Sequence, residues 1–335
     1  MIFDTSQPDT PILYRLEKAA IDIKNSNAFT DIAEKEVFAI LMRYGNIDIN
    51  KPLVPELYET SKEPDMNVEE DKEDGANAID TDTAMASYRE KEEKLQYSGG
   101  VFDIYFGIVM FLSLRSLKLH PLNDVSQFNV APKVTEYWLR YLLDNNVCPE
   151  IDDDEILKSL AVVERSKIEF INVRKLSKRL PGKFNEACSM LYGGTLKAIG
   201  DLQQSELDKD GSGNASDLNW APKSTVSLIT LAESKELCSQ LITEGVTHVK
   251  KESVDIRVEQ ILENDSQIVC HRWIRESTQP TGEPFRLVLD PDVIKYVCPG
   301  FYIEVDLHTL SNGMCYIDQV SGVWPSYTLL EDIII

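Results

Sequence analysis

The hydrophobic period of this chain changes once, from helical spacing in the first 245 residues to strict alternation after Val254. Before the change, apolar residues recur at intervals of three and four, which is typical of helices with one buried face. After it, Val254, Ile256 and Val258 alternate with polar neighbours, as in half-buried strands. The sequence therefore predicts an α+β protein, mainly helical in its N-terminal and central regions, with a small C-terminal antiparallel β-sheet.

The alternating region contains a hairpin signal. One run of alternating residues ends near Leu307 and is followed by Ser311-Asn312-Gly313, after which a second run begins at Cys315. Asn-Gly between two such runs is the strongest short-range indication of a β-hairpin. We expect this hairpin to form part of a β-rich region from 246 to 335.

Several helices are predicted upstream. The first starts at Thr10-Pro11, which we interpret as a capped N-terminus, and the second spans about 31–43. A buried helix is expected over 102–119, and one more over 224–243. Three others fill the central segment, where 132–143 precedes a long helix from Asp152 to Leu180 and a shorter one over 184–191. We expect the buried face of the first of these three to contain Val134, Tyr137, Trp138, Tyr141 and Leu142, and that of the long helix Ile156, Leu157, Leu160, Val163, Ile168 and Ile171.

An acidic stretch interrupts the helical region. Between Glu59 and Gln96 the apolar period is lost, and thirteen acidic residues stand against five basic ones. Such a composition is typical of a disordered linker or a large insertion. The expected organisation is therefore N-terminal helices over 1–58, an acidic linker over 59–98, a central helical region over 99–245 and the β-rich region over 246–335.

Charge and cysteine usage narrow the function classes. The net charge of -22 disfavours direct binding to nucleic acid or to an anionic membrane, and it favours a partner with a basic groove. The six cysteines form no C-x-x-C pair, and Met1-Ile2-Phe3-Asp4 does not begin a signal peptide, so we expect reduced thiols in an intracellular protein. The apolar run from Ile104 to Leu114 is shorter than the roughly 20 residues of a membrane helix, and no membrane association is expected.

Few residues suggest a catalytic or metal-binding site. The loop from Asp208 follows a calcium-loop pattern, but Asn219 stands where a bidentate glutamate is needed, so we predict an ordinary loop. Cys270 and His271 are adjacent and would point to opposite faces of a strand, whereas Cys148 with His120 is a second conceivable thiol and base pair. The four histidines lack metal-ligand spacing, and no metal or other cofactor is expected. The basic cluster from Arg174 to Arg179 is either a solvated helix end or a nuclear import signal.

Several motifs together resemble a known family. The stretches Val147-Cys-Pro-Glu150, Leu180-Pro-Gly-Lys-Phe-Asn185 and Ala187-Cys-Ser-Met-Leu-Tyr-Gly-Gly194 look like the fungal Argonaute-binding subunit of the Argonaute siRNA chaperone (ARC) complex. Tyr44-Gly45-Asn46-Ile47 is similar to a glycine-glycine-isoleucine step of that family, with Asn46 as a departure. Gly300 to Glu304, Leu310 to Gly313, Asp318 and Ser326 to Thr328 resemble its C-terminal hairpin.

The resemblance implies a regulatory subunit without enzymatic activity. Such a subunit would bind Argonaute while Argonaute holds duplex siRNA, would restrain slicing and passenger-strand release, and would act in RNA interference upstream of heterochromatic histone H3 lysine 9 methylation. It would work in the nucleus and the cytoplasm with a second adaptor subunit, and it would meet small RNA indirectly, through Argonaute. The alternative is a hydrolase or metal-dependent enzyme with an unrecognised Cys/His site.

Two kinds of residue are candidates for contact with the partner. Tyr192 and Trp324 are aromatic candidates close to the resembling motifs. A tethered polyanion beside the basic channel of Argonaute could also occupy phosphate positions, and the alternative is that the acidic stretch is only a solvated spacer. The acidic candidates are Glu69, Glu70, Asp71, Glu73 and Asp74, with Asp80 and Asp82 extending the same run.

Overall fold

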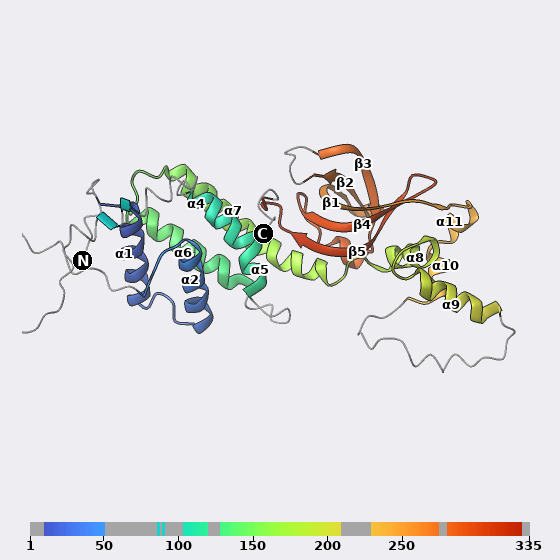
Figure 1. The fold of residues 1–335 in the computed structure, drawn as a ribbon, viewed down its shortest axis with the longest axis horizontal. Helices are drawn as coiled ribbons and strands as arrows, with labels where there is room; N and C mark the ends of the chain where they lie inside the picture. Colours follow the sequence, from blue (N-terminus) through green and yellow to red (C-terminus); the bar gives the residue numbers. More distant parts are fainter. Residues whose placement is uncertain are drawn as a thin grey trace, which may run out of the picture. The chain divides into compact units, whose positions relative to one another are not determined.

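A computed structural model describes residues 10–50, 86–87, 89–90, 103–119, 128–208, 229–274 and 280–329 of the chain. The chain forms two compact units, Met1–Lys167 and Ile168–Ile335, and the division falls inside one long helix, α7 (Asp153–Ser177). Figure 1 shows the elements in sequence colours. The division into four regions expected from the sequence stays a prediction.

The first unit is helical, and its elements confirm most of the expected helices. The span expected as one buried helix over 102–119 forms a continuous helical segment with a π-helical turn in its middle. The described elements are α1 (Ile12–Asn25), α2 (Ile32–Tyr44), α4 (Ile104–Met110), η1 (Phe111–Arg115), α5 (Ser116–Leu119), α6 (Val130–Asp144) and the first part of α7.

The core of this unit is formed by the predicted apolar faces. Leu16 and Ile23 of α1, Leu139 of α6 and Phe111 of η1 are almost inaccessible to solvent. Helices α1 and α2 both pack against α6. The expected cap at the start of α1 is wrong, because Pro11 occupies the N-cap position and no side chain caps the helix. The helix therefore forms with a buried apolar face and without a side-chain cap.

Three residues assigned to buried faces are exposed instead. Tyr137 is 40% exposed, Leu157 51% and Ile168 65%. At about 100° of rotation per residue, each lies more than about 100° from the centre of the buried stripe of its helix. The spacing of apolar residues at intervals of three and four included these residues because that spacing does not limit the width of the buried stripe.

The second unit combines short helices with a β-barrel. The expected helix over 224–243 is corrected, since its described part holds two short helices that are separated at Cys238, with Thr230 and Glu233 forming a capping box before the first. The helices are the end of α7, α8 (Lys183–Tyr192), α9 (Lys197–Asp208), α10 (Leu231–Leu237), α11 (Ser239–Thr243), the 3-10 turn η3 (Glu263–Asp265) and α12 (Pro291–Ile294). The strands are β1 (His248–Leu262), β2 (Gln267–Trp273), β3 (Pro280–Val288), β4 (Tyr302–Leu310) and β5 (Cys315–Trp324).

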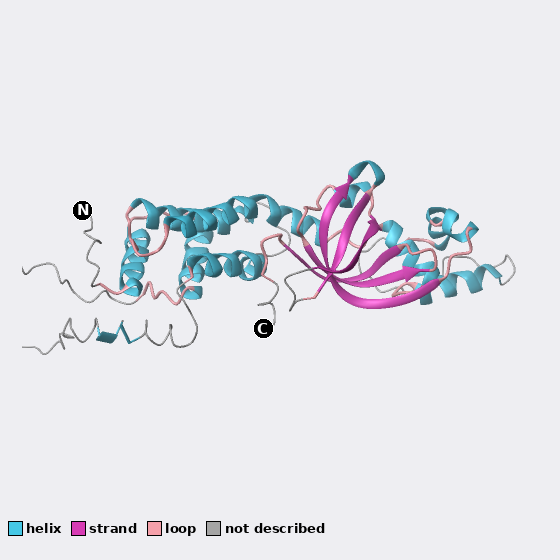
Figure 2. Ribbon diagram, turned by 90° about the horizontal axis from the view of Figure 1, so that it is seen from above, coloured by secondary structure: helices cyan, strands magenta, loops and turns pink. Residues whose placement is uncertain are grey.

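The five strands close into a barrel in the order β1-β2-β3-β5-β4. They are drawn in magenta in Figure 2. Four of the five pairings are antiparallel, as expected, but β3 and β5 run parallel where Leu287 faces Cys315. The predicted α+β class with a C-terminal, mostly antiparallel sheet is confirmed, whereas the parallel closing pair was not predicted; this order is that of a five-stranded Greek-key barrel of the OB type. Inward residues such as Ile256, Cys270 and Leu307 fill the interior.

The predicted hairpin is confirmed. It joins β4 to β5 through Ser311-Asn312-Gly313, and Gly313 has a φ of 84°, in the left-handed region that favours glycine. Helix α8 packs against β5. The contacts between α8 and the barrel therefore determine how the central motifs are placed.

Candidate functional site

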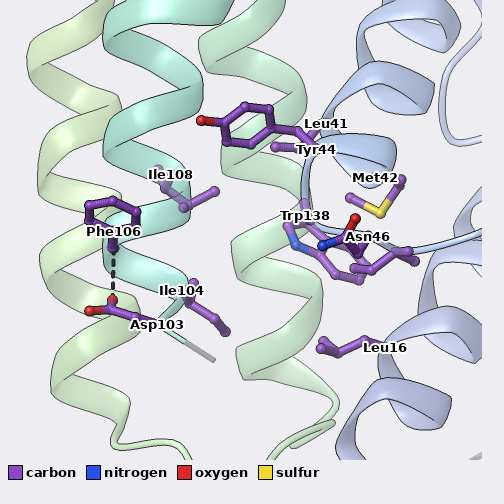
Figure 3. Close-up of a pocket in the computed structure, with 13 residues that line it drawn as sticks. Leu16, Leu41, Met42, Tyr44, Asn46, Asp103, Ile104, Phe106, Ile108 and Trp138 are labelled. Carbon is purple, nitrogen blue, oxygen red and sulfur yellow. Dashed lines mark hydrogen bonds between the residues drawn. The ribbon is translucent and has the colours of Figure 1, made fainter. Parts of the chain in front are cut away.

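An apolar pocket opens on the first unit among α1, α2, α4 and α6 (Figure 3). Its volume is about 350 Å³. Leu16 and Trp138 line it from α1 and α6, whereas Tyr44 and Phe106, which also line it, are 40% and 39% exposed. A cavity of this size and lining can hold an apolar side chain or a small apolar ligand.

The motif Tyr44-Gly45-Asn46-Ile47 builds one wall of this pocket. Helix α2 ends at Tyr44, Asn46 takes a φ of 56°, and the Ile47 N–H then donates to the Met42 carbonyl at 2.8 Å. Asn46 departs from glycine at the position that needs a left-handed backbone, and asparagine tolerates that conformation better than most residues. The departure therefore preserves the turn.

The pocket has little capacity for acid-base chemistry. Asp103 supplies the carboxylate among the lining residues, and this carboxylate accepts the Phe106 N–H at 2.7 Å as the N-cap of α4. Because its role is to cap a helix, the pocket is better suited to binding than to proton transfer.

A second motif, Val147-Cys-Pro-Glu150, is held by Arg15 of α1. The Arg15 guanidinium donates to the Val147 carbonyl at 2.9 Å and forms an ion pair with Glu150. Burial alone would raise the pKa of Glu150, but the hydrogen bond from Arg15, a backbone hydrogen bond and the charge of Arg15 together outweigh burial and lower that pKa. This motif thus joins the loop after α6 to α1.

The third motif joins α8 to the barrel through one buried amide. Asn185 is 1% exposed, and its Nδ2 donates to the carbonyls of Pro181 and Val288, both at 2.9 Å. Its Oδ1 accepts the Ile317 N–H at 3.0 Å. All three hydrogen bonds are made inside the protein, so Asn185 connects α8 with β3 and β5 without leaving a polar group unpaired.

Asp318 of β5 forms the other half of this junction. Its buried carboxylate accepts the Ser189 hydroxyl at 2.6 Å, the Thr195 N–H at 2.8 Å and the Thr195 hydroxyl at 2.9 Å. Gly194 lies beside it with a φ of 143°, and a Cβ there would stand 2.9 Å from the carboxylate. The Gly193 carbonyl accepts the Tyr316 hydroxyl at 2.5 Å. The Gly-Gly turn is therefore required for close packing of α8 on β5.

Tyr192, an expected partner contact, lies at this junction. It is half-buried and packs against the core cluster that contains Cys188, Cys238 and Tyr316. Burial raises the pKa of Tyr192 to about 12. The ring thus contributes to the interior of the second unit, and its part in partner binding stays a prediction.

Trp324, the other aromatic candidate, belongs to a separate cluster on the outer face of the barrel. It packs against Trp273 and Tyr302, whose ring centroids are 5.6 Å apart. The Arg257 guanidinium lies 4.9 Å from the Trp273 ring centroid and 5.3 Å from that of Tyr302. Side chains of β1, β2, β4 and β5 thus meet in one aromatic group, in which Trp273 and Tyr302 are buried and Trp324 is partly buried, with a cation over the rings.

The acidic candidates lie outside the described residues. These are Glu69, Glu70, Asp71, Glu73 and Asp74, together with Asp80 and Asp82. Four residues of the expected linker are described, at 86, 87, 89 and 90, and they are helical, where disorder was expected. The calcium-like loop after Asp208 and the residue His120 also lie outside the described part.

The adjacent Cys270 and His271 point to opposite faces, as predicted. Cys270 is fully buried, whereas His271 Nε2 lies 2.8 Å from Glu259 Oε2 on the outer face. Burial raises the pKa of the Cys270 thiol, so this thiol is a poor nucleophile. The two residues therefore do not form a thiol and base pair.

Two contacts were missed by sequence reasoning. His248 Nε2 and His308 Nδ1 lie 3.0 Å apart across β1 and β4, and Cys188 and Cys238 have sulfur atoms 3.8 Å apart. Hydrogen bonding to Cys238 and burial raise the pKa of the Cys188 thiol, and burial lowers the pKa of His308. Only the strand register of the barrel and the packing of the helices bring these residues together, so no local sequence pattern predicts the two contacts.

Within the described ranges, no three His, Cys, Asp or Glu side chains gather where they could hold a metal ion. Nor does that part of the chain contain a helix both long and apolar enough to span a membrane.

Comparison with known proteins identifies the family. The model of the family described as "Argonaute siRNA chaperone (ARC) complex subunit Arb1" matches residues 4–278 and 266–334. The chain belongs to the Arb1 family. A relative of this Arb1-family chain, Argonaute-binding protein 1 of Schizosaccharomyces pombe, is 24% identical over 250 residues, which cover 68% of this chain. The match spans 62% of that relative's length, and no solved structure matches the chain.

Proposed function

We propose that this chain is a subunit of an Argonaute siRNA chaperone complex that binds Argonaute and has no enzymatic activity of its own. The observation that carries the proposal is the match to the Arb1 family over nearly the whole chain. The name of the similar Schizosaccharomyces pombe protein supports Argonaute as the partner. The bound Argonaute would hold small RNA, and a second adaptor subunit would join the complex.

The proposed consequence of binding is that the activity of Argonaute is restrained. The subunit would slow slicing and passenger-strand release, and so support RNA-directed heterochromatin with histone H3 lysine 9 methylation. It would act in both nucleus and cytoplasm. The net charge of -22 supports a partner with a basic channel, since the charges of the two surfaces are complementary.

The acidic stretch would contribute to this restraint. Its carboxylates, tethered to the bound subunit, would compete with RNA phosphates for the basic channel at a high effective concentration. Exposed charge pairs are screened beyond about 8 Å at physiological ionic strength, so this part of the restraint would weaken as salt is added. The folded units would supply the binding itself.

Affinity purification from cells tests the proposal. A tagged full-length chain should recover an Argonaute with duplex small RNA and a second, unrelated subunit. Recovery should persist after RNase treatment, because the proposed contact is between proteins. Failure to recover any Argonaute from cells that contain both proteins would contradict the proposal.

A further inference from the structure

Three cations surround a single tyrosine on the second unit. Lys175 Nζ and Lys295 Nζ each lie 5.1 Å from the centroid of the Tyr296 ring, and the Arg179 guanidinium carbon lies 4.8 Å from it. We call these three cations and the ring the Tyr296 patch. Lys175 is in the last turn of α7 and Arg179 follows it, whereas Lys295 follows α12. The barrel thus brings together cations that are far apart in the sequence.

The Tyr296 patch concentrates positive charge. Since all three cations lie near one centroid, no two can be more than about 10 Å apart, which is close to the screening length of physiological salt. In the described part of the chain, none of the three forms an ion pair with a carboxylate, although other lysines, such as Lys250 and Lys251, do. Arg179 Nη1 donates to the Lys175 carbonyl, which brings no charge. The repulsion within the patch would be relieved by an anion from outside.

The chemistry of the patch favours phosphate. Arginine offers a planar fork of donors that matches two phosphate oxygens, and each lysine is a point charge that accepts varied approach angles. A nucleic-acid backbone presents successive phosphates, so several cations can be neutralised at once. The ring of Tyr296 holds the cations in place through cation–π contacts.

The overall charge determines how such an anion can arrive. A chain with a net charge of -22 repels free RNA, so a patch of three cations cannot recruit it from solution. A bound partner that already holds RNA raises the effective concentration of phosphate beside the patch. We propose that Lys175, Arg179 and Lys295 contact the phosphate backbone of small RNA held by the bound Argonaute. This inference rests on the proposed function.

The patch also gives the basic cluster of the sequence a different role. Of the six residues from Arg174 to Arg179, the first four belong to α7. Two of its cations face Tyr296 instead of projecting from an extended peptide. The structure therefore supports a folded helix end that presents charge to a ligand.

Photocrosslinking in the purified complex tests the inference. Argonaute loaded with 4-thiouridine-labelled duplex small RNA is purified on the tagged full-length chain and irradiated. We expect labelled RNA to crosslink to the chain, and the crosslink to fall roughly ten-fold or more in the Lys175→Gln, Arg179→Gln, Lys295→Gln triple variant. Lys295→Gln alone should give a smaller loss, and it touches no helix interior.

A matched control carries the same change of charge elsewhere. Lys35→Gln, Arg43→Gln and Lys158→Gln remove three exposed cations from α2 and α7. This control should crosslink as the unaltered chain does. All variants should recover Argonaute equally and keep the same melting temperature. If the triple variant fails to fold, the RNA crosslink of the Lys295→Gln variant alone tests the inference.

The other outcomes are separable. If Argonaute is recovered but the crosslink is absent, or is unchanged in the triple variant, the inference is overturned and the proposed function stands. If the triple variant loses Argonaute even after RNase treatment, the patch binds acidic protein surface and the RNA contact is wrong. If the unaltered chain recovers no Argonaute, the proposed function fails and the inference fails with it.

Discussion

Removal of the Asp318 carboxylate should loosen the junction between α8 and the barrel. In Asp318→Ala, the Ser189 hydroxyl and the N–H and hydroxyl of Thr195 lose their common acceptor. Because Asp318 is only 6% exposed, water cannot readily replace it. The donors would then be buried without partners, which costs more than the loss of a solvated hydrogen bond.

The magnitude follows from those three hydrogen bonds. A hydrogen bond to a charged group contributes about 1.5–3 kcal/mol, but three donors that share two oxygens do not contribute additively. The free energy of unfolding of the second unit should therefore fall by about 3–5 kcal/mol. Thr195→Val removes one side-chain donor and should cost about 1–2 kcal/mol. The double variant should lose less unfolding free energy than the sum of the losses in the two single variants, because both changes remove the same hydrogen bond.

Hydrogen exchange measured by mass spectrometry can localise the effect. Peptides covering 185–200 and 315–324 should exchange faster in Asp318→Ala, whereas peptides of α1 and α2 should not change. Denaturant unfolding gives the accompanying free energy. A loss below about 1 kcal/mol, or faster exchange spread evenly over both units, would refute the assignment of Asp318 as the acceptor that holds this junction.

Four further predictions concern other parts of the chain. Because Trp138 is only 4% exposed, Trp138→Ala should lower the free energy of unfolding by about 3–5 kcal/mol, measured by denaturant unfolding. Normal stability of this variant would instead indicate that Trp138 is an exposed interface anchor. Because burial lowers the pKa of His308, protonation opposes folding, so melting temperature should fall as the pH drops below about 6.5, and less so in His308→Phe. Millimolar calcium should leave the melting temperature unchanged; a rise that Asp208→Ala and Asp210→Ala abolish would contradict this. Changing Glu69, Glu70, Asp71, Glu73 and Asp74 to Gln and Asn should relieve inhibition of slicing in a purified assay but leave Argonaute recovery intact, and unchanged inhibition would end the decoy hypothesis.

Local physics made several elements predictable. The acidic residues at the start of α7 and the basic residues in its last turn agree with the helix dipole, and the helix lies where they predict it. The Asn312-Gly313 hairpin is similarly local, because its turn needs a residue that accepts positive φ. The width of the buried face of a helix was not predictable in this way, because it depends on how many neighbouring elements cover the helix. Leu157 and Ile168 were assigned to the buried face of α7 and are exposed.

The resembling motifs could be found in the sequence, but not their purpose. Asn185 and Gly194 stand in motifs that looked like family signatures, and the structure shows them joining α8 to β3 and β5. Their partners, Val288 and Asp318, are more than a hundred residues away. No spacing rule reaches that far, because such contacts depend on which strands become neighbours.

By itself, then, the sequence determined the α+β class, most helix positions, the hairpin and the family. Those features depend on backbone propensity, side-chain period and turn chemistry, all of which act within a few residues. Tertiary structure alone decided the closure of the barrel through the parallel pair of β3 and β5, the contact of His248 with His308, and the meeting of Lys175, Arg179 and Lys295 around Tyr296. These depend on register and packing between distant segments, where burial of the whole apolar surface selects one arrangement.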